Sequence, residues 1–214
     1  MFATLPKATI FLTALLFGVV SFMSQGIAND ALAAGHPAVK FVEKLGTSAI
    51  ASLTAKDITT REREKRVRDL LRTNFDLTTI GRFALGTYWK SASETQKKEY
   101  MDLFEDMVVK TYTQRFSEYS GQSFQVAGAI PASDKDSVVS SQLVQNDGSS
   151  INVEWRVRSK NGSMKVIDVV VEGISMSVTQ RSDFSSVIQK GNGDVDALIN
   201  TLRLRQNGAI AEKF

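Results

Sequence analysis

Residues 165–184, KVIDVVVEGISMSVTQRSDF, constrain the fold more than any other stretch of the chain. Residues 166–171 are rich in β-branched side chains and predict a buried or half-buried strand. Apolar and polar side chains alternate again over residues 174–179. The apolar residues on the inward face have odd numbers before Gly173 and even numbers after it. Because a one-residue slip exchanges the two faces of a strand, Gly173 is expected in a bulge or a sharp bend. We predict one long bent strand, or two in sequence, whose apolar face forms the floor of a cavity.

Two helices are predicted before residue 74. The first begins at Pro37, since proline suits the first helical turn, and its apolar residues recur at helical spacing as far as Leu53. Thr59 and Glu62 form a capping-box pattern for the second helix, which runs to about residue 73. Lys and Arg are interleaved with Asp and Glu on the outer face of this second helix. That pattern indicates a solvated helix with ion pairs, and no aromatic residue accompanies the cations as nucleic-acid binding would require.

Two further helices follow in the first half of the chain. Asp76 is expected to cap a short helix over residues 77–85, which Gly86 closes. Ser93 and Gln96 form a second capping box, and they open the longest helix, which ends before residue 121. Its apolar stripe consists of Tyr100, Leu103, Phe104, Met107, Val108, Thr111, Tyr112 and Phe116. Such a stripe is typical of plain core, but opposite the strand of residues 165–178 it would form the second wall of an apolar volume.

From residue 124 onward the apolar period changes from 3.6 to 2, which predicts strands. We expect strands over residues 124–127, 137–144 and 151–158, with hairpin turns at residues 146–148 and 161–162. After the sheet, Asp183 is expected to cap a helix that ends at residue 190, and a final amphipathic helix spans residues 195–202. A helical first half packed on a curved, mostly antiparallel sheet, with helices at the C-terminus, is an α+β fold.

The amino terminus has the order of a secretory signal. Lys7 precedes an apolar run over residues 8–23, and small residues follow near Ala28 and Ala33. We predict cleavage after one of these two alanines, so that residues 1–33 are a signal peptide, residues 34–208 form one domain and residues 209–214 are a polar tail. An uncleaved membrane anchor is the alternative. The apolar run over residues 8–23 is, however, shorter than the ~20 residues that a membrane span needs.

Residues suited to catalysis are few. The chain has no Cys and a single histidine, His36, so metal sites and most nucleophilic arrangements have no candidate residues, and no cofactor is expected. Asp168 and Glu172 share a strand face at a separation of about 13 Å. A carboxylate pair that acts on one bond needs ~5–9.5 Å. These two carboxylates are therefore expected to pair with cations such as Arg156, and the chain is best interpreted as a binding protein with an apolar interior.

The pattern K-V-x-D-V-x-V-E-G-[IV]-S at residues 165–175, followed by Arg181 and a helix near Phe184, carries a family resemblance. Together with residues 75–121 it resembles the MlaC family of periplasmic lipid-binding proteins, also called toluene-tolerance proteins, which serve an ABC-transporter system. Two positions depart from that family. Met164 stands where relatives often carry Trp, and Thr179-Gln180 stand where Asn-Tyr is usual, so the detailed shape of the pocket stays open.

The resemblance implies a periplasmic shuttle with no catalytic activity of its own. Its partners would be an outer-membrane lipoprotein–porin complex and an inner-membrane ABC transporter with an MCE substrate-binding subunit, and its role would be to maintain outer-membrane lipid asymmetry. A slot between helices and sheet would hold phospholipid acyl chains, with the headgroup toward solvent. Each buried CH₂ contributes about 0.8 kcal/mol, so two tails contribute on the order of 20 kcal/mol. Enclosing them takes a pocket at the upper end of ~300–1,000 Å³.

Carried over by position, the expected tail contacts are apolar residues of the helices and the sheet. They are Phe83, Phe104, Val108, Tyr112, Trp155, Val169, Val171, Ile174 and Met176. Arg181 is expected either near the mouth of the cavity or in a structural pair with Glu172 or Asp168.

Three alternatives remain open at this point. The cargo could be a hopanoid or another isoprenoid lipid. The protein could be an isomerase-like enzyme on a cone-shaped α+β scaffold, with Asp168 as its base. It could also be an adaptor whose apolar stripe is only core. Nucleic acid is not an expected partner.

Overall fold

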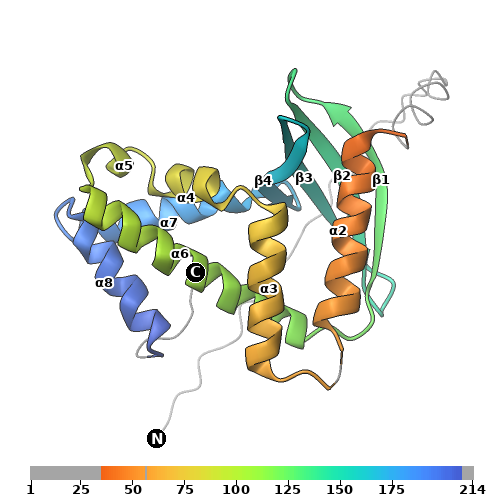
Figure 1. Cartoon of the computed structure of the whole chain (residues 1–214), viewed down its shortest axis with the longest axis horizontal. Coiled ribbons are helices and arrows are strands. Elements are labelled where there is room, and N and C mark those ends of the chain that lie inside the picture. Colours follow the sequence, from red (N-terminus) through yellow and green to blue (C-terminus); the bar gives the residue numbers. More distant parts are fainter. Residues whose placement is uncertain (1–34, 56, 209–214) are drawn as a thin grey trace, which may run out of the picture.

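The structure is a computed structural model, and it describes residues 35–55 and 57–208. The predicted signal peptide and the predicted polar tail lie outside the described residues. Within them, no helix is both long enough and apolar enough to cross a membrane. The helices of one lobe lie beside a twisted sheet, and helix α2 (Pro37–Leu53) lies across one face of that sheet (Figure 1).

The predicted helices of the first half are confirmed. They are α2 (Pro37–Leu53), α3 (Thr60–Asn74), α4 (Leu77–Leu85) and α6 (Glu94–Ser117), with the short α5 (Tyr88–Ser91) between the last two. The hydroxyl of Thr59 and the carboxylate of Asp76 accept backbone N–H groups at the starts of α3 and α4, as expected. At the start of α6 both halves of the predicted capping box between Ser93 and Gln96 are present.

The predicted antiparallel meander is also confirmed. The strands are β1 (Ser123–Pro131), β2 (Asp136–Val144), β3 (Ser150–Lys160), β4 (Ser163–Val171) and β5 (Ile174–Ser175), hydrogen-bonded in that order. Each neighbouring pair is antiparallel. β1 is longer than the predicted strand, because it continues past an irregularity between Val126 and Gly128 to the edge of the turn into β2.

The prediction for residues 174–190 was wrong in two respects. The chain does not continue as a strand to Val178, and a helix does not begin at Asp183, because α7 (Met176–Lys190) already starts at Met176. The hydroxyl of Ser175 accepts the backbone N–H of Val178 and caps this helix. The alternating pattern over residues 174–179 is therefore two strand residues followed by the first turn of a helix.

Gly173 does sit at a sharp bend, as predicted, but the change of parity has a different origin. Glu172 and Gly173 have φ values of 48° and 78° and form a two-residue hairpin turn that pairs Val171 with Ile174. The register between β3 and β4 shifts earlier, where Val157 pairs with Val166 and Arg156 with Asp168, so that Ile167 is the extra residue of a bulge. Val166 is consequently fully buried, whereas the sequence pattern predicts Ile167 as the first inward-facing residue of this strand.

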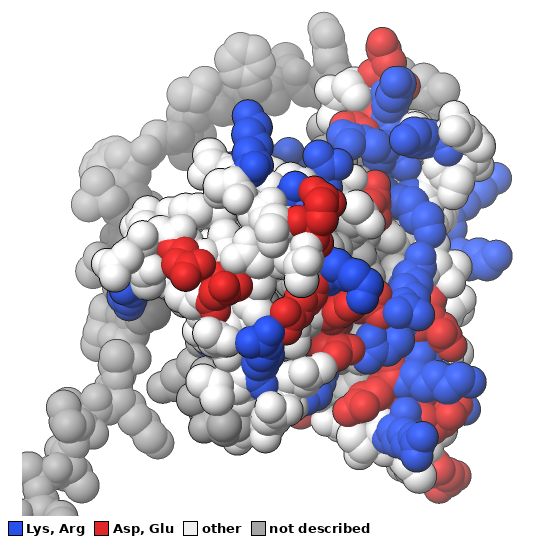
Figure 2. Space-filling model, turned by 60° about the vertical axis from the view of Figure 1, so that its left-hand side comes forward, with Lys and Arg blue, Asp and Glu red and all other residues white. Residues whose placement is uncertain are grey.

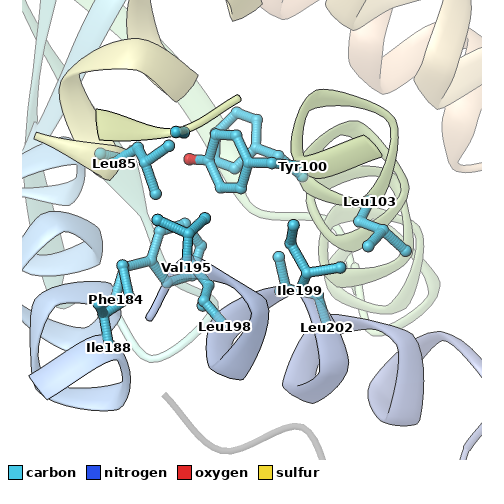
Figure 3. Packing of buried hydrophobic residues seen from close by; sticks show 12 residues of the cluster. Leu85, Tyr100, Leu103, Phe184, Ile188, Val195, Leu198, Ile199 and Leu202 are labelled. Carbon is cyan, nitrogen blue, oxygen red and sulfur yellow. The ribbon is translucent and has the colours of Figure 1, made fainter. Parts of the chain in front are cut away.

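The apolar core has three parts. The largest lies between α4, α6, α7 and the final helix α8 (Val195–Gln206), where Tyr100 and Phe184 face the apolar side of α8 (Figure 3). A second cluster lies between α2 and the sheet, and a third joins α2, α3 and α6. The α4–α7–α8 lobe and the α2–sheet layer therefore have separate cores.

The interpretation of α3 as a solvated helix with ion pairs is confirmed. Arg68 reaches Glu105 at 2.6 Å and Asp106 at 2.7 Å on α6, and Arg66 pairs with Glu62 at 2.7 Å within α3. Positive and negative side chains alternate over the right-hand part of the surface in Figure 2, whereas the helices that come forward on its left carry fewer charges. The two pairs of Arg68 join α3 to α6.

Candidate functional site

The structure brings together two residues that the sequence places 98 positions apart, Phe83 on α4 and Arg181 on α7. The guanidinium carbon of Arg181 lies 5.2 Å from the centre of the Phe83 ring, which is a cation–π distance. The Phe83 side chain is nevertheless 40% exposed. The pair thus presents a cation and an apolar ring side by side at the surface.

Gly86 makes room for this arrangement. It ends α4 with a φ of +62°, a conformation that L side chains rarely adopt. A Cβ at this position would lie only 2.9 Å from Nε of Arg181. The glycine that the sequence predicts as a helix terminator therefore also seats the guanidinium group.

Three more large apolar side chains stay exposed where β5 leads into α7. Ile174 is 59% exposed, Met176 36% and Val178 54%. Together with Phe83 they form what we call the exposed apolar set. Val178 was missing from the predicted tail contacts, although the alternation that singled out Ile174 and Met176 also includes it.

Three other predicted contacts share one face of the sheet. Trp155 on β3 pairs directly with Val169 on β4, and Val171, two residues further along β4, pairs with Val153. The Trp155 ring packs edge-on against Phe124, at 6.0 Å between centroids, and its Nε1 donates to the hydroxyl of Ser141 at 2.9 Å. Trp155 packs against the cluster that α2 covers and so lines the α2–sheet layer, and Val169 lies half-buried opposite it on the same face of the sheet.

The three predicted contacts on α6 lie deeper. Phe104 is 2% exposed and packs against the rings of Tyr100 and Phe184, at 5.9 and 6.3 Å between centroids. Val108 and Tyr112 pack against the cluster that joins α2, α3 and α6, and burial raises the pKa of the Tyr112 hydroxyl. The predicted residues therefore occupy three regions: the surface of α4 and α7, the sheet face, and the helical core. Their role as tail contacts stays a prediction.

The carboxylate of Asp168 accepts hydrogen bonds from neighbouring residues of the fold. Its Oδ1 accepts hydrogen bonds from the backbone N–H and the hydroxyl of Ser177, at 3.1 and 2.7 Å, and its Oδ2 accepts from the hydroxyl of Ser175 at 2.7 Å. The predicted pairing with Arg156 is present at 3.9 Å. Glu172 instead accepts the backbone N–H of Asn152. Asp168 thus ties the end of the sheet to the start of α7.

The described surface is hollowed beside α7 and near the start of α2. One hollow, of about 410 Å³, is an open space over the outward face of α7, bordered by Val178, Arg181, Ser182, Ser185, Ser186 and Gln189. The other, of about 310 Å³, lies between the start of α2 and the rim of the sheet, where Met164 forms part of its wall. Of the predicted site residues only Arg181 lines either hollow. The described residues contain no cluster of His, Asp or Glu side chains suited to hold a metal ion.

The helices and the antiparallel sheet define an α+β protein. The solved structure of a phospholipid-binding protein from Ralstonia solanacearum, in complex with a phospholipid, superimposes with a TM-score of 0.70 at 23% identity. The match covers 81% of this chain and 98% of that one. The profile of the MlaC protein family matches residues 43–204. The chain belongs to the MlaC family.

Two curated relatives agree with this assignment. The chain is 23% identical over 199 residues to the intermembrane phospholipid transport system binding protein MlaC of Haemophilus influenzae, covering 89% of this chain and 90% of that protein. It is 25% identical over 113 residues to the toluene tolerance protein ttg2D of Pseudomonas putida, covering 53% of each. The family is thus one of lipid-binding transport proteins rather than of enzymes.

Proposed function

We propose that this chain is a periplasmic phospholipid carrier that exchanges lipid between an outer-membrane lipoprotein–porin complex and an inner-membrane ABC transporter. The observation that carries the proposal is the exposed apolar set beside Arg181. Exposed apolar surface contributed by large side chains is typical of a binding site, and Phe83, Ile174, Met176 and Val178 are each 36–59% exposed. Acyl tails would cover Phe83, Ile174, Met176 and Val178, while Arg181 contacts the lipid phosphate.

The family and the named relatives support the choice of lipid. A phosphodiester is a suitable partner for a guanidinium group, because it accepts two parallel charge-assisted hydrogen bonds. Each CH₂ that leaves water contributes about 0.8 kcal/mol, so even part of a tail on the exposed apolar set gives usable affinity. Export of the chain by residues 1–33 and removal of that segment belong to the same proposal.

Native mass spectrometry of the mature protein, purified from the periplasm without detergent, tests this function. We expect a mass increase of one diacyl phospholipid per protein, and solvent extraction followed by tandem mass spectrometry would name it. An isoprenoid in the extract would replace phospholipid by hopanoid-type cargo. A lipid-free mass that persists after incubation with liposomes would overturn the carrier function and favour the adaptor.

A further inference from the structure

The surface on which Phe83 and Arg181 meet combines exposed apolar side chains with a cation. Phe83 on α4 is 40% exposed, and Ile174, Met176 and Val178, where β5 leads into α7, are 36–59% exposed. Arg181 lies one helical turn beyond Val178 on α7, and its guanidinium carbon is 5.2 Å from the centre of the Phe83 ring. The exposed apolar set thus spans three elements, and a cation lies between its two parts.

Aromatic rings and cations continue next to Phe83 on α4 and α5. Arg82 precedes Phe83 and is exposed, and its guanidinium carbon lies 5.3 Å from the centre of the half-buried Trp89 ring on α5. Lys90 follows Trp89 and is exposed as well. Aromatic rings accompanied by Lys and Arg are typical of protein surfaces that lie at the level of lipid headgroups.

The charges on this part of the chain have one sign. Residues 77–93 and 174–182 contain three cations and no Asp or Glu. The cations are Arg82, Lys90 and Arg181. The carboxylates that flank these segments cap α4, pair with a lysine of α6 or accept a backbone N–H of β3, and Asp183 is half-buried. A partner with a negatively charged surface is therefore complementary to this face of the protein.

We propose that the exposed apolar set, together with Arg82, Lys90 and Arg181, is a docking surface that holds the lipid-free protein on an anionic lipid bilayer. The apolar side chains enter the boundary between headgroups and acyl chains, and the cations attract the anionic headgroups. The inference rests on the proposed carrier function and adds to it the regulation of the same site. A bound phospholipid covers the apolar side chains and neutralises Arg181, so the loaded protein leaves the bilayer.

Co-sedimentation with sucrose-loaded vesicles tests the docking surface. Delipidated mature protein, and the same protein loaded with phosphatidylglycerol, are mixed with vesicles of phosphatidylcholine alone or of phosphatidylcholine with phosphatidylglycerol. We expect the lipid-free protein to pellet with the mixed vesicles, and the loaded protein to partition onto them about tenfold less. Pelleting should be weaker on phosphatidylcholine alone and should fall as salt is added, because salt screens the attraction between the cations and the headgroups.

Charge-matched variants separate this surface from the general attraction of a basic protein to an anionic bilayer. Arg82→Gln with Lys90→Gln removes two cations of the docking surface. It should lower the partition coefficient of the lipid-free protein by about tenfold or more, since each cation near the bilayer contributes about fivefold. The matched control is Arg61→Gln with Lys65→Gln, which removes two exposed cations from α3 and should lower the partition coefficient much less.

The possible outcomes distinguish this inference from the function on which it rests. An equal loss in both double variants would overturn the docking surface, because binding would then follow net charge alone. Equal pelleting of the loaded and the lipid-free protein would also overturn it. If the lipid-free protein does not pellet but still acquires lipid, the docking surface is wrong, the carrier function stands, and this face is one for a protein partner. A protein that pellets through Arg82 and Lys90 but never binds a lipid molecule would overturn the carrier function itself.

Discussion

Asp168 holds Ser177 by two hydrogen bonds, one from the backbone N–H at 3.1 Å and one from the hydroxyl at 2.7 Å. Both groups are buried, and the second oxygen of the same carboxylate accepts the hydroxyl of Ser175. A strand residue thereby fixes the first turn of α7, the helix that carries Met176, Val178 and Arg181. The position of the candidate site depends on this connection.

Replacement of Asp168 should therefore affect stability rather than chemistry. Asp168→Ala leaves buried donors without an acceptor, and we expect it to lower the free energy of unfolding by about 2–3 kcal/mol in urea titrations. Asp168→Asn keeps an acceptor oxygen and should cost less, with lipid uptake retained. The control is Asp102→Ala, whose carboxylate is 73% exposed and lies 3.8 Å from Lys98. An Asp168→Asn protein that folds normally but loses a catalytic turnover would instead support the isomerase-like alternative.

The same connection explains which parts of the fold could be predicted from the sequence. The capping box of Ser93 and Gln96 is local, and so is the alternation of β3, so both were predicted correctly. The start of α7 depends on Asp168, eight residues before Met176 and on another element, so the serine–apolar alternation was interpreted as a strand. The proximity of Phe83 and Arg181 likewise results from packing between α4 and α7, which no local pattern encodes.

Two phenylalanines predicted as tail contacts should respond differently to truncation. Phe104 is 2% exposed among aromatic rings, so Phe104→Ala should lower the free energy of unfolding by about 3–5 kcal/mol. Phe83 is 40% exposed, so Phe83→Ala should lower it by about 1 kcal/mol or less while reducing the lipid retained through purification. Thermal and urea unfolding of the delipidated proteins measure the first effect, and native mass spectrometry measures the second. Equal stability losses would contradict the packing described for Phe104.

Gly86→Ala should both strain the backbone and displace Arg181. The positive φ at Gly86 costs an L residue about 1–3 kcal/mol, and the new Cβ would lie 2.9 Å from Nε of Arg181. We expect reduced stability together with weaker lipid uptake. Gly148→Ala is the matched control, since Gly148 also has a positive φ, of 84°, but a Cβ there would meet no atom within 4 Å. If both variants retain lipid equally, Gly86 does not seat the guanidinium group.

The ion pair between Asp136 and Arg158 should make stability depend on pH in the acid range. Arg158 donates two hydrogen bonds to the Asp136 carboxylate, at 2.7 and 2.8 Å, and thereby lowers the pKa of that carboxyl. Because the folded-state pKa lies below the unfolded-state value of about 4, the stabilisation is present above that value and is lost as the pH falls through the lowered pKa.

The comparison of wild type with Asp136→Asn measures this pH-dependent contribution to the free energy of unfolding. The two side chains are partly exposed, so the difference in the free energy of unfolding at pH 6 should be no more than about 1 kcal/mol. It should disappear when the pH is lowered past the pKa of Asp136. A difference that stays constant down to the lowest pH at which the protein folds would show that the carboxylate charge is not its source.

Ile174 and Ile130 offer the sharpest test of the exposed apolar set, because they are 59% and 66% exposed and both lie on strands. Asparagine at either position should change the free energy of unfolding by about 0.5 kcal/mol or less, as is usual for surface positions. Only Ile174 lies beside Met176 and Val178, so only Ile174→Asn should reduce lipid uptake from vesicles, since it removes apolar surface that an acyl tail would cover. An equal reduction in both variants would mean that uptake follows general surface hydrophobicity. No reduction in either would remove Ile174 from the site and leave the tails to the α2–sheet layer around Trp155 and Val169.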